Sequence, residues 1–220
     1  MLPIHPERRL AIAYAPPAAR AGLTALFALD ERLGGIVART VEPTIGLMRL
    51  VWWRDALTAL DGGPPPAEPL LAAMASAGLS GVALGAMVEG WEALIDDPAF
   101  AETTVALHAV ERGGRLFRLA GAILGAADTE AERLERAGAA WAQVDLARHT
   151  TDSARAADIL ASARMPLEAA MAARWPRRLR PLGQLVALAL DDARRGVGRW
   201  REPASPARLL RILRLQLTGR

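Results

Sequence analysis

Aromatic and charged side chains are densest in the run MRLVWWRDAL, which holds Arg49, Trp52, Trp53 and Arg54. Adjacent residues of a helix point about 100° apart, so the two tryptophans cannot both face the same core. We expect one of them to pack inside, where an aromatic ring buries about 150–250 Å². The other is expected at a rim beside Arg49 or Arg54, where it would contact a lipid pocket or a partner.

The histidines give little support to a catalytic site. His149 lies among polar residues, a setting more typical of a surface or capping group than of a general base. His5 and His108 are assigned no role. The sequence has no Ser/His/Asp arrangement with interpretable context, no phosphate-binding glycine loop and no HExxH pair. It also has no cysteine, so neither a disulfide framework nor a thiolate metal site is available.

Helices must position all of these residues. Apolar residues recur at helical spacing in almost every segment, and no stretch alternates long enough to predict a strand. Prolines and glycines delimit helices expected at 7–14, 18–38, 43–60, 70–77, 84–95, 98–124 and 129–148. Gly113-Gly114 is expected to be a soft point, Thr129 and Glu132 to form a capping box, Pro166 to interrupt the chain, and Pro206 to open a last helix. The pattern predicts an all-α bundle of about eight to ten helices.

Length and composition favour one domain spanning residues 1–220, because 220 residues that are 52% hydrophobic can bury a sizeable core. The opening MLPIHPERR has no apolar segment of the kind found in secretory signals. Charges interrupt each apolar run before it reaches the length of a membrane span. We therefore expect a cytoplasmic protein that can still lie peripherally at a membrane.

Charge is unevenly distributed along the chain. Residues 1–173 hold 15 arginines against 21 acidic residues, whereas residues 174–220 hold 12 arginines against 3 acidic residues. A basic end of this kind suits an anionic contact, although it is also compatible with a solvated surface. Nucleic acid is not expected, because the arginines have no interleaved aromatics and no DNA-binding motif is present.

Two runs, ERRLAIAYAPPAARAGLTALFAL and the more specific EPTIGLMRLVWWRDAL, resemble the squalene/phytoene synthase family. These all-α enzymes condense two prenyl diphosphates head to head. The resemblance covers most of the chain, weakens after Arg148, and is closest to the family's complex I assembly-factor-like, aspartate-poor branch. It implies a single helical domain of the isoprenoid (terpenoid) synthase type, shortened after Arg148.

The resemblance also implies where metal ligands should lie. Family enzymes hold magnesium through an Asp-Asp-x-x-Asp signature and a second acidic cluster on a facing helix. The first signature falls on Gly34, Gly35 and Ala38, which offer no ligand atom. In the second cluster, His149 and Ser153 replace aspartates. No catalytic residue, metal or other cofactor is therefore expected.

Four polar residues remain near these positions and are kept as a residual polar set: Asp30, Asp145, Arg148 and Asp152. Asp30 and Asp145 each lie four residues before a lost ligand, one helical turn or about 5.4 Å away. A displaced single magnesium site would use Asp30, Asp145, His149 and Asp152. The alternative is that each acid pairs with an arginine, for which Arg32 and Arg148 are available.

The last segment, PARLLRILRLQLTGR, predicts a basic amphipathic helix. Leu209, Leu210, Leu213 and Leu217 fall within about 100° of arc. The opposite side holds three arginines, expected at a membrane surface: Arg208, Arg211 and Arg214. The helix would either lie on an anionic bilayer or dock on the bundle.

Three functions are left open. The first, which the missing aspartates favour, is a non-catalytic squalene/phytoene synthase-like protein acting in assembly or scaffolding at the inner membrane, with respiratory complex I assembly as the implied context. The second is a head-to-head prenyltransferase of isoprenoid biosynthesis with a degenerate magnesium site. The third is a non-enzymatic module that binds a prenyl lipid.

Overall fold

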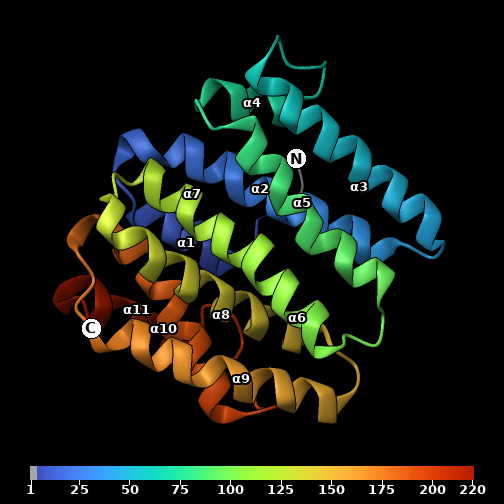
Figure 1. The fold of residues 1–220 in the computed structure, drawn as a ribbon. Coiled ribbons are helices and arrows are strands. Elements are labelled where there is room, and N and C mark those ends of the chain that lie inside the picture. Colours follow the sequence, from blue (N-terminus) through green and yellow to red (C-terminus); the bar gives the residue numbers. More distant parts are fainter. Residues whose placement is uncertain (1–3) are drawn as a thin grey trace.

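A computed structural model describes residues 4–220 as a set of helices joined by short loops, with no strand among these residues (Figure 1). At the upper end of this view lie α3 (Pro43–Thr58), α4 (Pro69–Ser76) and α5 (Gly81–Asp96). At the lower end lie α8 (Ala131–His149), α9 (Ser153–Ala172), α10 (Arg180–Arg195) and α11 (Pro206–Thr218). The predicted all-α class of the isoprenoid synthase type is confirmed.

The middle of the molecule is formed by α1 (Pro6–Tyr14), α2 (Pro17–Arg39) and one continuous rod. This rod consists of α6 (Glu102–His108), the π-helical turn η2 (Ala109–Gly114) and α7 (Arg115–Ile123). The predicted soft point at Gly113-Gly114 lies in the π turn. A π turn inserts an extra residue into an α-helix and often marks a functional site.

Three glycines let neighbouring helices approach this turn closely. A Cβ atom on Gly138 of α8 would lie 2.1 Å from the carbonyl oxygen of Gly113. A Cβ atom on Gly90 of α5 would lie 2.7 Å from the backbone nitrogen of Arg112. The backbone of η2 therefore sits directly against α5 and α8, which fixes the position of the Arg112 side chain.

One continuous apolar core runs through the bundle. It includes Trp53, Trp91, Trp141 and Trp175 together with leucines from most of the helices. Helix α10 is buried along most of its length and packs on α8, α9 and α11. Burial of this apolar surface is the main favourable term in folding.

Two local predictions are wrong. Pro166 does not interrupt the chain but lies inside α9, whose buried Ala163, Leu167 and Ala170 hold the helix in place despite the hydrogen bond that proline removes. Thr129 does not form a capping box with Glu132. It lies in a 3₁₀ turn, η3 (Asp128–Glu130), where the Glu130 carboxylate accepts a hydrogen bond from the Ala127 N–H instead.

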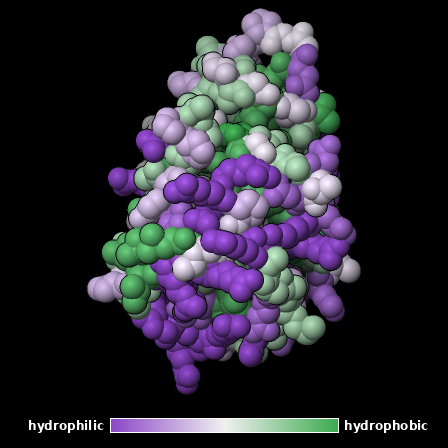
Figure 2. Space-filling model, turned by 90° about the vertical axis from the view of Figure 1, so that its left-hand side faces the viewer, coloured by the Kyte–Doolittle hydropathy of each residue, from purple (hydrophilic) through white to green (hydrophobic). Residues whose placement is uncertain are grey.

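The C-terminal helix docks on the bundle through Arg208, Ile212 and Leu215. Arg208 is 1% exposed, so its predicted place at a membrane surface is wrong. The leucine face is free, with Leu210 68% and Leu217 70% exposed. Figure 2 views the side on which α11 lies in Figure 1 and shows an apolar patch within a mostly hydrophilic surface. Within residues 4–220 no helix combines the length and the apolarity that a membrane crossing needs.

Candidate functional site

Four of the positions that the family resemblance singled out line one cavity of about 620 Å³, whereas Asp152 and Ser153 do not. Gly34, Gly35 and Ala38 of α2 line one wall, and His149 of α8 lines another. The helices that bear the two sets thus face each other across the centre, as the resemblance implies. The cavity is where any remaining site chemistry must be sought.

A buried arginine occupies the floor of this cavity. Arg112, which the π turn presents, donates from Nε to Asp30 Oδ1 at 2.8 Å and from Nη2 to Asp30 Oδ2 at 2.9 Å. The same Nη2 donates to Asp145 Oδ2 at 2.6 Å. One guanidinium group therefore joins the two acids that the sequence had left as residual ligands.

A second arginine reaches the same acids from α1. Arg8 Nη1 donates to Asp30 Oδ2 at 2.9 Å and to Glu31 Oε1 at 2.8 Å. Its Nη2 lies 3.5 Å from Asp145 Oδ2. The cluster of Arg8, Asp30, Glu31, Arg112 and Asp145, here called the central ion network, pairs two guanidinium groups with three carboxylates.

The two arginines determine the protonation of the acids. Burial by itself would raise the pKa of the Asp30 carboxyl, but the Arg112 and Arg8 charges outweigh it and hold that pKa below its usual value. The same opposition, with Arg112 again the strongest counter-charge, lowers the pKa of Asp145 well below its usual range. Both acids are therefore carboxylates at neutral pH, and both are already neutralised.

His108 is a further hydrogen-bond partner of Arg112. Its Nδ1 lies 2.7 Å from the Gly90 carbonyl oxygen and its Nε2 lies 3.3 Å from Arg112 Nη1. The ring therefore donates from Nδ1 and accepts at Nε2, the neutral tautomer. Burial, with Arg112 adding to it, lowers the pKa of His108 to about 3. His108, which the sequence interpretation left without a role, is thus part of the site.

Aromatic rings enclose the arginine on both sides. The Arg112 guanidinium carbon lies 4.1 Å from the centre of the Trp91 ring and 5.2 Å from that of Trp141. The guanidinium carbon of Arg8 also lies 5.0 Å from the centre of the Trp141 ring. Cation–π contacts of this kind are strongest where water is excluded. The network is therefore held by packing as well as by charge.

Trp91 also fills the place of a lost ligand. A Cβ atom built on Gly34 would lie 2.8 Å from Trp91 Cη2, a distance that no side chain tolerates without displacing the ring. At residue 34, onto which the sequence resemblance lays the first aspartate of the family signature, the indole leaves no room for a side chain.

The other residual polar residues do not join the network. Asp152 is the N-cap of α9, where its carboxylate accepts from the N–H groups of Ala154 and Arg155. Ser153 is the first residue of that helix. His149 lines the cavity, with Nδ1 2.8 Å from the Asp145 carbonyl oxygen. Asp152 is therefore a helix cap rather than a residual ligand.

The predicted arginine partners are also wrong. Arg32 lies 5.8 Å from the centre of the Trp53 ring, and Arg148 lies 3.6 Å from Asp192 and over Trp200. The hypothesis that Asp30 and Asp145 pair with arginine is correct, but the arginines are Arg8 and Arg112. Neither lies near the acids in sequence, so no local pattern indicated them.

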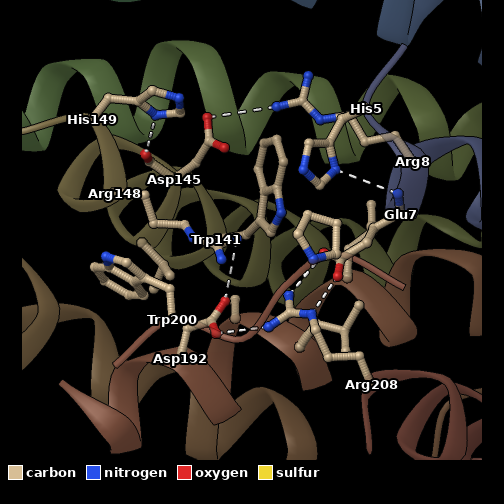
Figure 3. A pocket seen from close by; sticks show the side chains of 15 residues that line it. His5, Glu7, Arg8, Trp141, Asp145, Arg148, His149, Asp192, Trp200 and Arg208 are labelled. Carbon is tan, nitrogen blue, oxygen red and sulfur yellow. Dashed lines mark hydrogen bonds and ion pairs between the residues drawn. The ribbon is translucent and has the colours of Figure 1, made fainter. Parts of the chain in front are cut away.

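A second, smaller cavity of about 260 Å³ adjoins the first and is shown in Figure 3. On one side the Asp145 carboxylate approaches Arg8, with His149 next to the Asp145 carbonyl, and on the other Arg148 and Arg208 converge on Asp192 (Figure 3). Arg208 Nη1 lies 2.7 Å from Asp192 Oδ1, and its Nη2 donates to Glu7 at 2.8 Å. This pairing attaches α11 to α1 and α10 and explains why Arg208 is buried.

The adjacent tryptophans of α3 point in different directions, one into the core and one to the surface, as predicted for neighbouring residues of a helix. Trp53 is 5% exposed and packs inside, whereas Trp52 is 50% exposed beside Arg49. Arg54 turns away and pairs with Glu92 of α5 at 2.8 Å. Trp52 and Arg49 are therefore the members of the cluster that are accessible to a partner.

The donor set does not fit the magnesium that the family resemblance implies. Magnesium requires hard oxygen ligands at about 2.0–2.1 Å in near-octahedral geometry. Gly34, Gly35 and Ala38 supply none, and the oxygens of Asp30 and Asp145 already accept hydrogen bonds from guanidinium groups. Within the part of the chain that the structure describes, no three His, Cys, Asp or Glu side chains are placed to hold a metal ion.

Comparison with known proteins gives one result for the family. A family model described as squalene/phytoene synthase matches residues 5–214. No curated protein matches the chain. The match covers nearly the whole sequence, including both walls of the cavity and the helices that bear the central ion network.

Proposed function

The chain belongs to the squalene/phytoene synthase family, and we propose that it is a non-catalytic member acting in assembly or scaffolding at the inner membrane. The context implied by its sequence resemblance is the assembly of respiratory complex I. The observation that carries the proposal is the pairing of Asp30 and Asp145 with Arg112 and Arg8.

The pairing matters because of what ionisation of a prenyl diphosphate requires. Charge that develops on the leaving diphosphate must be stabilised by preorganised cations in a site that excludes water. In a magnesium-dependent family enzyme, unpaired carboxylates hold those cations. Here Asp30 and Asp145 hold guanidinium groups that are themselves fixed, so each of these two carboxylates already has a positive partner within the protein. The network therefore acts as structure rather than as a receptor for metal and diphosphate.

Purified protein incubated with farnesyl or geranylgeranyl diphosphate and magnesium tests the catalytic part of the proposal. We expect pyrophosphate release no faster than in a blank without protein, because the ligands for the metal are absent or paired. Asp145→Asn, which keeps the shape of the side chain, should leave this baseline unchanged. Magnesium-dependent release that disappears in Asp145→Asn would show a working prenyltransferase and contradict the proposal.

The assembly part is tested in the native host. Deletion of the gene should reduce the amount of assembled complex I on native gels and leave squalene and phytoene levels unchanged, and the wild-type gene should restore the complex. Unchanged complex I together with altered isoprenoid products would instead support the enzymatic alternative.

A second function is favoured by the cavity itself. Its volume of about 620 Å³ lies within the range of small-molecule pockets, and Val37, Trp91, Leu94, Phe100 and Leu146 give it apolar walls. Non-catalytic binding of a prenyl lipid is therefore the alternative. Farnesol should quench tryptophan fluorescence in wild type but not in Ala38→Trp, which fills the rim of the cavity. Ala161→Trp, at an exposed position on α9, is the matched control. Equal quenching in all three proteins would contradict lipid binding in this cavity.

A further inference from the structure

Helix α3 has an apolar stripe on its outer side. Ile45, Met48 and Trp52 follow one another at a spacing of three and four residues, which aligns them on one side of the helix, and Val41 lies just before the helix begins. These four residues are between 49% and 94% exposed. Isolated apolar residues on a surface are normal, whereas a continuous stripe is a mark of an interaction site.

The opposite side of α3 already has its partner. Gly46, Leu50, Trp53 and Leu57 are buried on that side, and the helix packs extensively on α5. Helix α3 is therefore apolar on two sides. A helix that is apolar all round is normally enclosed by other protein. The outer stripe is exposed instead, so nothing among residues 4–220 covers it.

The stripe borders a groove of about 550 Å³ between α2 and α3. Both helices contribute to its lining, which includes Arg32, Ile36, Arg39, Met48, Arg49 and Trp52. No acidic residue lines the groove, and none of its three arginines forms an ion pair with a residue in the described part of the chain. The groove thus combines apolar side chains with uncompensated positive charge.

We propose that this groove binds an amphipathic helix of a partner protein, with acidic residues beside the apolar stripe of that helix. Three observations support this occupant. The unpaired arginines favour an occupant with negative charge, the stripe matches the repeat of a facing helix, and tryptophan and arginine are enriched among the residues that contribute most binding energy at protein interfaces. The inference rests on the proposed scaffolding function and names its partner surface.

A bilayer fits this surface less well than a helix. The groove is concave, so it suits a rod more than a flat membrane. The free leucine face belongs to α11, which lies at the other end of the molecule from α3 in Figure 1, so one membrane plane cannot contact both. If α11 lies on lipid, α3 points away from it.

The test measures binding of a defined probe to the full-length chain. The probe, called the acidic peptide, is a stapled, fluorescein-labelled helical peptide with leucines at helical spacing and glutamates on both flanks. The control, called the lysine peptide, is the same peptide with lysine at each glutamate position. We expect the acidic peptide to bind, to shift the emission of Trp52, and to weaken as salt rises because exposed charges are screened. The lysine peptide should bind at least about tenfold more weakly.

Variants locate the binding surface. Met48→Glu and the pair Arg39→Glu, Arg49→Glu should each weaken the acidic peptide by about tenfold or more, because they place negative charge in the groove. The matched controls are Met165→Glu on α9 and Arg9→Glu on α1, both at exposed positions, and neither should change binding.

The inference would be overturned if the acidic peptide did not bind, or if it bound wild type and Met48→Glu equally. Binding of anionic vesicles that is lost in Met48→Glu would overturn it by assigning the groove to lipid. Self-association that is lost in the same variant would overturn it by assigning the groove to a second copy of the chain. None of these results depends on pyrophosphate release or complex I levels, so failure here is distinguishable from failure of the proposed function.

Discussion

At the scale of single residues, Arg112 determines what the centre of the molecule can bind. Its guanidinium group lies where two acids from facing helices converge, and it supplies the positive charge there. A bound metal can exchange, whereas an arginine side chain cannot leave. The charge that bridges α2 and α8 is consequently a permanent part of the fold.

The first prediction concerns the cost of removing that charge. Arg112→Met should lower the free energy of unfolding by about 3 kcal/mol, because it leaves Asp30 buried with only Arg8 as a counter-charge. Urea unfolding followed by tryptophan fluorescence measures the change. The control is Arg164→Met, which breaks an exposed i,i+4 pair with Glu168 and should cost less than about 1 kcal/mol. A similar, small effect of both substitutions would contradict a structural role for the network.

The second prediction concerns pH. His108 has a pKa of about 3 in the folded protein, below its ordinary value of about 6.5. Between these values only the unfolded chain takes up the proton, so stability is complete above about pH 6.5 and falls as the pH is lowered. Between pH 6.5 and pH 5 the free energy of unfolding should fall by about 2 kcal/mol.

Replacing the histidine isolates its contribution. His108→Gln keeps one donor for the Gly90 carbonyl and one acceptor for Arg112, and should remove most of the slope in urea unfolding measured between pH 7 and 5. Burial also lowers the pKa of His5, so His5→Gln should remove a smaller part. The depressed pKa values of Asp30 and Asp145 act in the same direction, but only below about pH 4, where unfolded aspartates take up protons. An unchanged slope in His108→Gln would contradict the assignment.

At the scale of elements, the π turn and the crossing of the α6–η2–α7 rod with α8 position Arg112. The crossing is a contact between backbones, because Gly113 and Gly138 have no side chains to keep them apart. Larger residues would push α8 away from the turn, and Asp145 lies on the helix that would move. The glycines are therefore needed for the network as well as for packing.

The third prediction tests this crossing. Gly138→Ala should lower the free energy of unfolding by about 2 kcal/mol, despite the better helix propensity of alanine, since its Cβ would overlap the Gly113 carbonyl oxygen. Gly114→Ala, in the π turn itself, is the control, because a Cβ atom at residue 114 would meet only ordinary contacts at 3.4 Å or more. Thermal unfolding measures the midpoint temperature of each variant. Gly138→Ala should lower this temperature clearly more than Gly114→Ala does. Equal midpoint temperatures would show that α8 and the π turn are not in close contact.

At the scale of the whole molecule, the two exposed apolar surfaces lie at opposite ends. The stripe of α3 borders a basic groove, and the leucine face of α11 lies beside the arginine-rich end of the chain. This arrangement would allow the protein to contact a membrane through one end and a protein through the other.

The fourth prediction concerns the membrane end. The protein should bind anionic vesicles at low salt through α11, with affinity falling as salt rises. Arg208 is buried, so only Arg211 and Arg214 remain to contribute, at about 1 kcal/mol each near the surface. Vesicle co-sedimentation should therefore be lost in Leu210→Glu, Leu217→Glu and kept in Met165→Glu. Failure of wild type to bind such vesicles at low salt would leave α11 with a purely structural role.

The sequence by itself indicated the helices before residue 149 and the last helix, the burial of only one of the two adjacent tryptophans, and the absence of ligand atoms at Gly34, Gly35 and Ala38. Each of these follows from residue type or from spacing over one or two helical turns. The soft point at Gly113-Gly114 belongs to the same group, because two adjacent glycines weaken a helix wherever they occur.

Only the tertiary structure decided which charges meet. Arg112 and Asp30 are 82 residues apart, and Arg208 and Glu7 are 201 residues apart. Periodicity describes neighbours within a helix and says nothing about which arginine of 27 reaches a given acid. That choice depends on how helices cross, and the crossing depends on the close contact of Gly90, Gly113 and Gly138 around the π turn. The missing ligand atoms at Gly34, Gly35 and Ala38 could therefore be read from the sequence, whereas the pairing of Asp30 and Asp145 with Arg112 became visible only in three dimensions.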